Sequence, residues 1–185
     1  SALELADDWR ELESRQVLQG GAFAHDLVHD AVLQGLPEII ARHLHGRAAA
    51  WLQSNGGEPG RIAAHWLAAG QRARAGPAVR AAADHAHRAL REGERIALLL
   101  QAADLAEAGG RPDEAFELVR SAIAGHMNTI RQTDGLPLLD RLDALATTAL
   151  QRARAAADRA WYSAVLGDLD AAIVQGRAAL AQARA

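Results

Sequence analysis

The chain has 185 residues, of which 50% are hydrophobic, so it can bury the core of one domain and a small appendage. Cysteine is absent, which excludes disulfides, thiolate chemistry and cysteine-ligated zinc, and which suits a cytoplasmic protein. No apolar stretch approaches the roughly 18 residues of a membrane span, and no signal-peptide pattern opens the chain, so we expect no membrane contact.

The formal net charge is −3, and every one of the 20 basic residues is an arginine. The arginines are spread among acidic residues rather than gathered into a stripe. A protein that grips nucleic acid through its phosphates needs a coherent basic face. We therefore predict that this segment does not bind nucleic acid directly.

The first elements are an amphipathic helix over 3–15 and a short hairpin. Leu5, Trp9 and Leu12 recur at helical spacing in the helix. Residues 16–19 and 22–25 flank a Gly-Gly pair, which favours a tight turn between two strands. A helical run over 26–33 comes next. Helix, hairpin and helix predict that residues 1–36 are the C-terminal part of a winged-helix domain.

The remainder, 37–185, is predicted to be helical throughout. Alanine is abundant, β-branched residues are scarce, and apolar residues recur every three or four positions. All five prolines stand near the expected helix starts, where a missing N–H costs nothing. The predicted helices cover 37–54, 59–69, 77–91, 94–108, 112–125, 137–150, 153–166 and 169–184.

Two stretches read as helix, tight turn and helix. In 105–115 the turn is Gly109-Gly110, and in 166–172 it is Gly167-Asp168, with Asp168 as the predicted N-cap. Small inner residues let paired helices approach closely, and this half of the chain resembles tetratricopeptide-type repeats. The fold class expected is all-α, a right-handed α-α superhelix with a concave binding groove. An irregular helical bundle is the alternative.

One motif is more specific. The stretch from Phe23 to Val32, which contains His25-Asp26-Leu27-Val28, resembles the motif that closes the winged helix of STAND-class signalling ATPases and large LuxR-type transcriptional regulators. Segments 36–49 and 62–70 are similar to the stretch after that motif in those regulators. The resemblance covers most of residues 1 to about 125.

The resemblance implies a nucleotide, which this chain alone has no means to hold. STAND ATPases bind ATP with a Gly-rich loop and a lysine, and this chain has no lysine. We therefore expect it to be a segment of a larger protein, with Ser1-Ala2 left from an expression tag. In that parent, His25 would contact an ADP phosphate and the partner would be an upstream nucleotide-binding domain. Alternatively, His25 only ends the hairpin or caps the next helix.

No catalytic or metal-binding residue is predicted. His25 and His29 resemble a zinc-protease motif superficially, but the acid between them is the shorter Asp26. The pairs His43/His45 and His85/His87 are two residues apart, so their side chains diverge on a helix. The serines lack the neighbours of a nucleophile. No cofactor is expected in this chain.

Tryptophans and one polar helix face complete the candidate residues. Trp51, Trp66 and Trp161 occupy apolar helix positions and are predicted to fill the core between helix pairs, or alternatively to line a pocket. Four polar residues share one helix face and are predicted to be solvated, although they are also candidate groove residues: Arg80, Asp84, His87 and Arg91.

The sequence supports two functions from different classes. The first is a non-catalytic sensor or scaffold arm of a STAND-type regulator, whose helices bind a protein, a peptide or a small inducer. The second is a free-standing helical-repeat adaptor. A phosphate-loop lysine upstream of Leu3 in the parent reading frame would decide between them. A metal-dependent hydrolase is the least supported reading.

Overall fold

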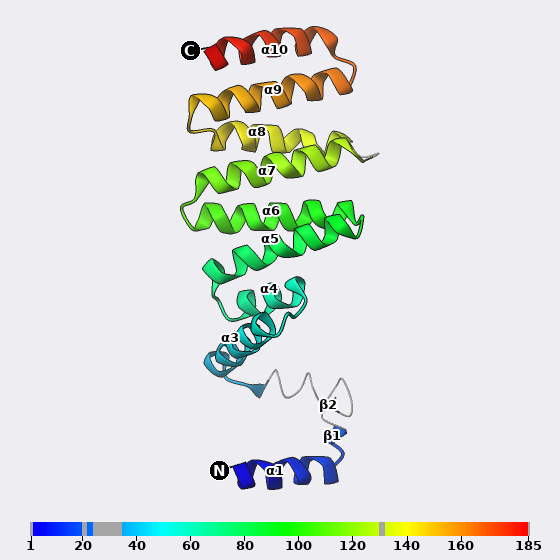
Figure 1. The fold of residues 1–185 in the computed structure, drawn as a ribbon, viewed down its shortest axis with the longest axis vertical. Coiled ribbons are helices and arrows are strands. Elements are labelled where there is room, and N and C mark those ends of the chain that lie inside the picture. Colours follow the sequence, from blue (N-terminus) through cyan, green and yellow to red (C-terminus); the bar gives the residue numbers. More distant parts are fainter. Residues whose placement is uncertain (1, 20–21, 24–34, 130–131, 185) are drawn as a thin grey trace. The chain divides into compact units, whose positions relative to one another are not determined.

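The computed structural model describes residues 2–19, 22–23, 35–129 and 132–184. These residues form nine α-helices, one 3-10 turn and one pair of two-residue strands (Figure 1), which confirms the all-α class for the described part. Two compact units divide between His45 and Gly46, within helix α3. The predicted domain division after residue 36 stays a prediction.

The first unit contains a helix and the strand pair. Helix α1 covers Ala2–Ser14, and its Trp9 Nε1 donates to Glu13 Oε1 at 3.2 Å. Strand β1 (Leu18–Gln19) pairs antiparallel with β2 (Ala22–Phe23), as the predicted hairpin requires. The Gly-Gly turn, His25 and the helix predicted over 26–33 lie outside the described residues. The winged-helix assignment therefore stays a prediction.

The second unit, Gly46–Ala185, is a consecutive array of helices. After α3 (Glu38–Ser54) come α4 (Pro59–Ala68), α5 (Arg72–Arg88), α6 (Glu92–Ala108) and α7 (Pro112–Met127). The 3-10 turn η1 (Gln132–Gly135) leads into α8 (Leu136–Leu145), α9 (Ala149–Val165) and α10 (Leu169–Arg184). From α4 onward each helix packs on the next, and α9 also touches α7 (Figure 1).

Alanine dominates the core of this array. Fully buried alanines alternate with a few large side chains, of which Phe116, Ile123, Leu142 and Tyr162 are the main ones. A separate cluster around Trp66 holds α3, α4 and α5 together through Ala49, Ile62 and Ala75. Small residues let the helix axes approach closely, and the few large ones fill the remaining space.

The connecting turns share one geometry. At five of them a backbone N–H donates to the carbonyl five residues earlier, and the residue just before that N–H has positive φ, which is the Schellman ending of a helix. The positive-φ residues at these five turns are Gly56, Gly70, Leu90, Gly110 and Gly167. Helices α5, α6 and α7 consequently begin at residues 72, 92 and 112, twenty residues apart. A helix pair therefore spans forty residues, longer than a 34-residue repeat. The tetratricopeptide class and the right-handed superhelix stay predictions.

Two predicted helix starts are wrong. Pro59 and Pro112 begin their helices as expected, but Pro77 lies inside α5, which begins at Arg72. The turn at Gly70 is short, so the next helix begins only two residues later. The burial of Val79 and its neighbours then stabilises α5 by more than the one hydrogen bond that Pro77 cannot make.

The second error concerns α8 and α9, predicted as 137–150 and 153–166. Helix α8 ends at Leu145, because a capping box starts α9 at Ala149. Gln151 N donates to Thr148 Oγ1 at 3.1 Å, and Thr148 N donates to Gln151 Oε1 at 3.0 Å. These bonds satisfy two N–H groups that a helix start leaves unpaired.

Candidate binding pocket

The arginines are not evenly mixed with acids, contrary to the sequence-based interpretation. Residues 46–90 contain six arginines and only two acids, Glu58 and Asp84. None of these six arginines forms an ion pair with the described residues: Arg47, Arg61, Arg72, Arg74, Arg80 and Arg88. An excess of positive charge over nearby carboxylates attracts anions.

Further along the array the arginines are paired. Arg141 bridges Asp104 and Glu107, and Arg159 bridges Asp140 and Asp143 at 2.8 and 2.5 Å. Arg141 thus links α8 to α6, and Arg159 links α9 to α8. Burial works to lower the pKa of Arg141, but its hydrogen bonds to Glu107 and Asp104 raise it overall. These arginines hold helices of the array together. Neighbouring carboxylates neutralise their charge, so they attract a ligand less than an unpaired arginine would.

Three hollows in the array are candidates for binding. The smallest, about 180 Å³, lies between α7 and α9 beside Arg120 and Asp158. Arg120 Nε donates to Asp158 Oδ2 at 2.7 Å, so this hollow already contains a closed ion pair. Burial raises the pKa of Asp158 above its ordinary value of 3.8, although Arg120 opposes the rise. This pair serves packing between helices.

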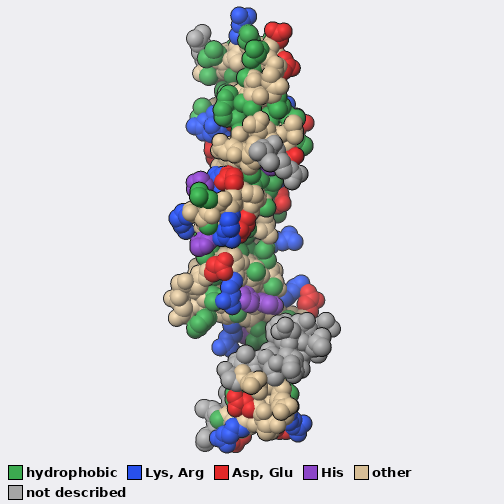
Figure 2. All heavy atoms as spheres, turned by 90° about the vertical axis from the view of Figure 1, so that its right-hand side faces the viewer, with side chains coloured by type: hydrophobic (Ala, Val, Ile, Leu, Met, Phe, Trp, Pro, Cys, Tyr) green, Lys and Arg blue, Asp and Glu red, His purple; other side chains and the backbone are tan. Residues whose placement is uncertain are grey.

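A second hollow is an apolar groove of about 370 Å³ between α9 and α10. Leu150, Leu180 and small residues line it, and Arg154 at its edge pairs with Glu117 at 3.0 Å. Figure 2 shows hydrophobic side chains exposed at this end of the molecule. Apart from Arg154, which is already paired with Glu117, the lining of this groove offers only apolar surface and no polar side chain to select a ligand.

The third hollow, the α3–α5 pocket, is the largest of the three at about 460 Å³. It lies where α3, α4 and the first turns of α5 meet, and no acidic residue lines it. Its lining consists of Ala50, Gln53, Ser54, Trp66, Ala73, Arg74 and Pro77. Apolar walls with a few convergent polar groups are typical of ligand sites of this size.

Trp66 organises the polar part of the α3–α5 pocket. Its ring is buried, with 2% of its surface exposed, and its Nε1 donates to Gln53 Oε1 at 3.3 Å. The guanidinium of Arg74 stacks over the same ring, with its central carbon 4.9 Å from the ring centroid. This cation–π contact fixes the guanidinium while leaving its N–H edge able to donate to a ligand.

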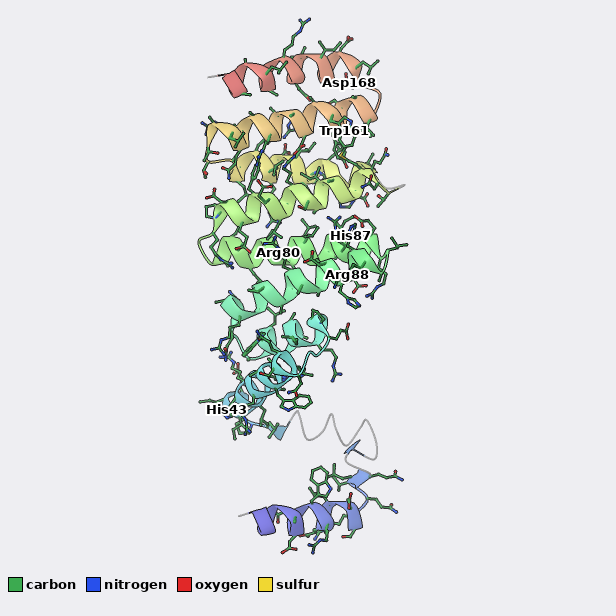
Figure 3. All side chains as sticks on the ribbon, viewed as in Figure 1. His43, Arg80, His87, Arg88, Trp161 and Asp168 are labelled. Carbon is green, nitrogen blue, oxygen red and sulfur yellow. The ribbon has the colours of Figure 1, made fainter. Side chains whose placement is uncertain are left out.

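Of the three tryptophans predicted in the core, only Trp66 is buried. Trp51 on α3 is 64% exposed and Trp161 on α9 is 57% exposed, so the core prediction is wrong for both. Trp161 lines the small α7–α9 hollow, in agreement with the alternative prediction that these side chains line pockets. Figure 3 labels Trp161 on α9.

The other predicted residues lie apart from the pocket. His25 lies outside the described residues, and His43 and His85 are exposed. Asp168 caps α10 as predicted, accepting from Ala171 N at 3.0 Å. The four residues predicted to share a polar helix face are exposed as expected, although α5 ends at Arg88 and Arg91 stands just before α6: Arg80, Asp84, His87 and Arg91. Figure 3 labels two of these four, Arg80 and His87, and also labels Arg88. None of the four lines the α3–α5 pocket.

Sequence reasoning missed Arg74 and Gln53. Two signals could have drawn attention to them: the excess of arginine over acid between residues 46 and 90, and the eight-residue separation of Trp66 and Arg74 across a Gly-containing turn. Neither signal alone places the guanidinium over the ring, because that depends on how α4 and α5 cross.

Comparisons with protein-family models, with curated proteins and with solved structures gave no match. Within the described ranges, no three His, Asp or Glu side chains gather closely enough to hold a metal ion. In the same part of the chain, no helix has both the length and the apolar character to cross a membrane.

Proposed function

We propose that this chain is the sensor and scaffold arm of a STAND-type ATP-dependent regulator, and that its helical array binds a protein, a peptide or a small inducer. The observation that carries the binding role is the α3–α5 pocket, a hollow of about 460 Å³. Its lining combines alanine, proline and Trp66 with polar side chains, among them an arginine, Arg74, that has no ion pair with the described residues. Helical arrays of this kind present side chains from successive helices to one extended ligand.

The regulatory part of the proposal rests on the resemblance of residues 23–32 to the motif that closes a STAND winged helix. By that resemblance His25 would contact an ADP phosphate supplied by an upstream domain, and ligand binding on the array would alter how tightly ADP is held. An imidazole can donate a hydrogen bond to a phosphate oxygen, so the chemistry is sound. A free-standing helical-repeat adaptor is the alternative.

Selection from a random dodecapeptide display library tests the binding role. We expect the immobilised chain to enrich a family of related peptides, and each synthetic peptide to bind the chain with one-to-one stoichiometry in calorimetric titration. A library that yields no enriched family, or peptides that bind without saturation, would contradict recognition by the array.

The parent reading frame separates the two functions. The regulator requires a phosphate-loop Gly-Lys-Ser or Gly-Lys-Thr sequence encoded upstream of Leu3. If that sequence is absent, the adaptor is the better description. The chain alone, which has no lysine, should show no micromolar affinity for ATP in calorimetric titration.

A further inference from the structure

We infer that the α3–α5 pocket binds a carboxylate of an acidic peptide segment, with Arg74 as the residue that pairs with it. The inference rests on the proposed recognition role of the array and names the ligand class for it. Arg74 carries the positive charge, Trp66 holds it in position, and Gln53 and Ser54 provide further polar groups beside it.

The guanidinium is prepared for a carboxylate in two ways. Because it is stacked on Trp66, less rotamer freedom is lost when a ligand binds. Because Arg74 forms no ion pair within the described part of the chain, no existing pair there has to be broken first. A planar guanidinium edge matches the two oxygens of a carboxylate and donates to both.

The neighbouring groups suit the same ligand. Gln53 accepts the indole N–H with its oxygen, which leaves its amide N–H groups to donate elsewhere. The Ser54 hydroxyl makes no hydrogen bond with the described residues and can also donate. Helix α3 ends at Ser54 with a partial negative charge, and α5 begins at Arg72 with a partial positive charge. These two helix dipoles offset each other, so the net positive charge of the pocket comes from Arg74.

A peptide fits the wider surface better than nucleic acid does. The other five arginines of residues 46–90 are distributed over three helices, with Arg47 on α3, Arg61 on α4 and the rest on α5. Within α5, Arg80 and Arg88 are eight residues apart, which separates them by about 12 Å along the helix axis and by about 80° around it. Spaced single charges suit separated carboxylates, whereas duplex DNA presents regular rows of phosphates.

The test uses the whole chain and fluorescein-labelled hexaglutamate in a fluorescence anisotropy titration. We expect saturable binding to the unaltered chain, no binding of labelled hexaglutamine, and weaker binding of a 20-base-pair DNA duplex. Arg74→Gln should weaken hexaglutamate binding at least about tenfold, because it removes a charge-assisted pair. Arg74→Lys should give an intermediate loss, because it keeps the charge but not the bidentate edge.

Arg177→Gln is the matched control. Arg177 is an exposed arginine of α10 without an ion pair to the described residues, at the other end of the array from the pocket. This variant should weaken binding less than about threefold, as expected for a remote exposed charge. Circular dichroism checks that each variant is folded. If Arg74→Gln does not fold, Arg74→Lys takes its place in the comparison with the control.

Three results would overturn the inference: equal losses for the Arg74 and Arg177 variants, DNA binding tighter than hexaglutamate binding, or displacement of hexaglutamate by free glutarate at equal carboxylate concentration. If hexaglutamate fails to bind but the display library yields peptides, the recognition role stands and the acidic assignment falls. If neither binds, both fall.

Discussion

Leu90 is an unusual residue in the array. It occupies the left-handed position of the α5–α6 turn with φ 57°, where four equivalent turns have glycine. Its side chain is 89% exposed, so it gains no burial in return for the backbone strain. A β-carbon in this conformation lies too close to the following carbonyl oxygen, which costs roughly 1–2 kcal/mol.

Leu90→Gly should relieve this strain, while the greater entropy of glycine in the unfolded chain offsets part of the gain. We therefore expect the free energy of unfolding to rise by up to about 1 kcal/mol. Urea denaturation followed by circular dichroism measures this. Ala89→Gly is the control, because Ala89 has φ −86° and gains nothing from glycine. A Leu90→Gly chain as unstable as the Ala89→Gly chain would show that the turn is not strained.

At the same scale, the tryptophans show what a sequence can and cannot tell. Helical spacing places Trp51 and Trp66 equally well on apolar stripes. Trp66 lies on the face of α4 that α3 and α5 cover. On α3, the buried face contains Ala49, and Trp51 lies outside it. Periodicity identifies apolar faces, but tertiary contacts decide which of two neighbouring faces is buried.

At the scale of helices, α6 and α7 approach each other closely along Gly125. A β-carbon added there would lie 2.8 Å from Ile96 Cγ1 and 2.7 Å from Glu92 Oε1. Glu92 could swing aside, but Ile96 is buried in the core and has little room to move. The absence of a side chain at Gly125 is what allows these two helices to pack.

Gly125→Ala should destabilise the chain by about 1–2 kcal/mol, since the overpacking outweighs the better helix propensity of alanine. Gly93→Ala is the matched control: Gly93 lies in the first turn of α6 with nothing within 4 Å of an added β-carbon. It should be neutral or up to about 1 kcal/mol stabilising. Thermal unfolding of both variants checks this, and a stabilising Gly125→Ala would refute the close approach.

Most helices could be predicted from the sequence, and their ends less well. Glycine at the turns and proline at Pro59 and Pro112 place the starts of α4 and α7 correctly. Pro77 misleads because a helix held by packing tolerates one missing hydrogen bond in its second turn. The α3–α5 pocket was not predicted, since it depends on three helices crossing and not on any contiguous motif.

For the array as a whole, charge is divided along the chain. Arginines without an ion pair to the described residues are concentrated on α3, α4 and α5, whereas the arginines of α7, α8 and α9 are mostly paired with carboxylates. Figure 2 shows arginine and histidine side chains standing together in the middle of the face it presents. This division assigns recognition to α3–α5 and structural cohesion to the later helices.

Hydrogen–deuterium exchange of the whole chain, with and without a peptide selected from the display library, tests this division most directly. Bound peptide should slow exchange in the part of α3 after Gly46, in α4 and in the first turns of α5. Exchange in α1 and in α10 should stay unchanged. Slower exchange confined to residues 1–36, or to the apolar groove of α9 and α10, would contradict recognition at the α3–α5 pocket.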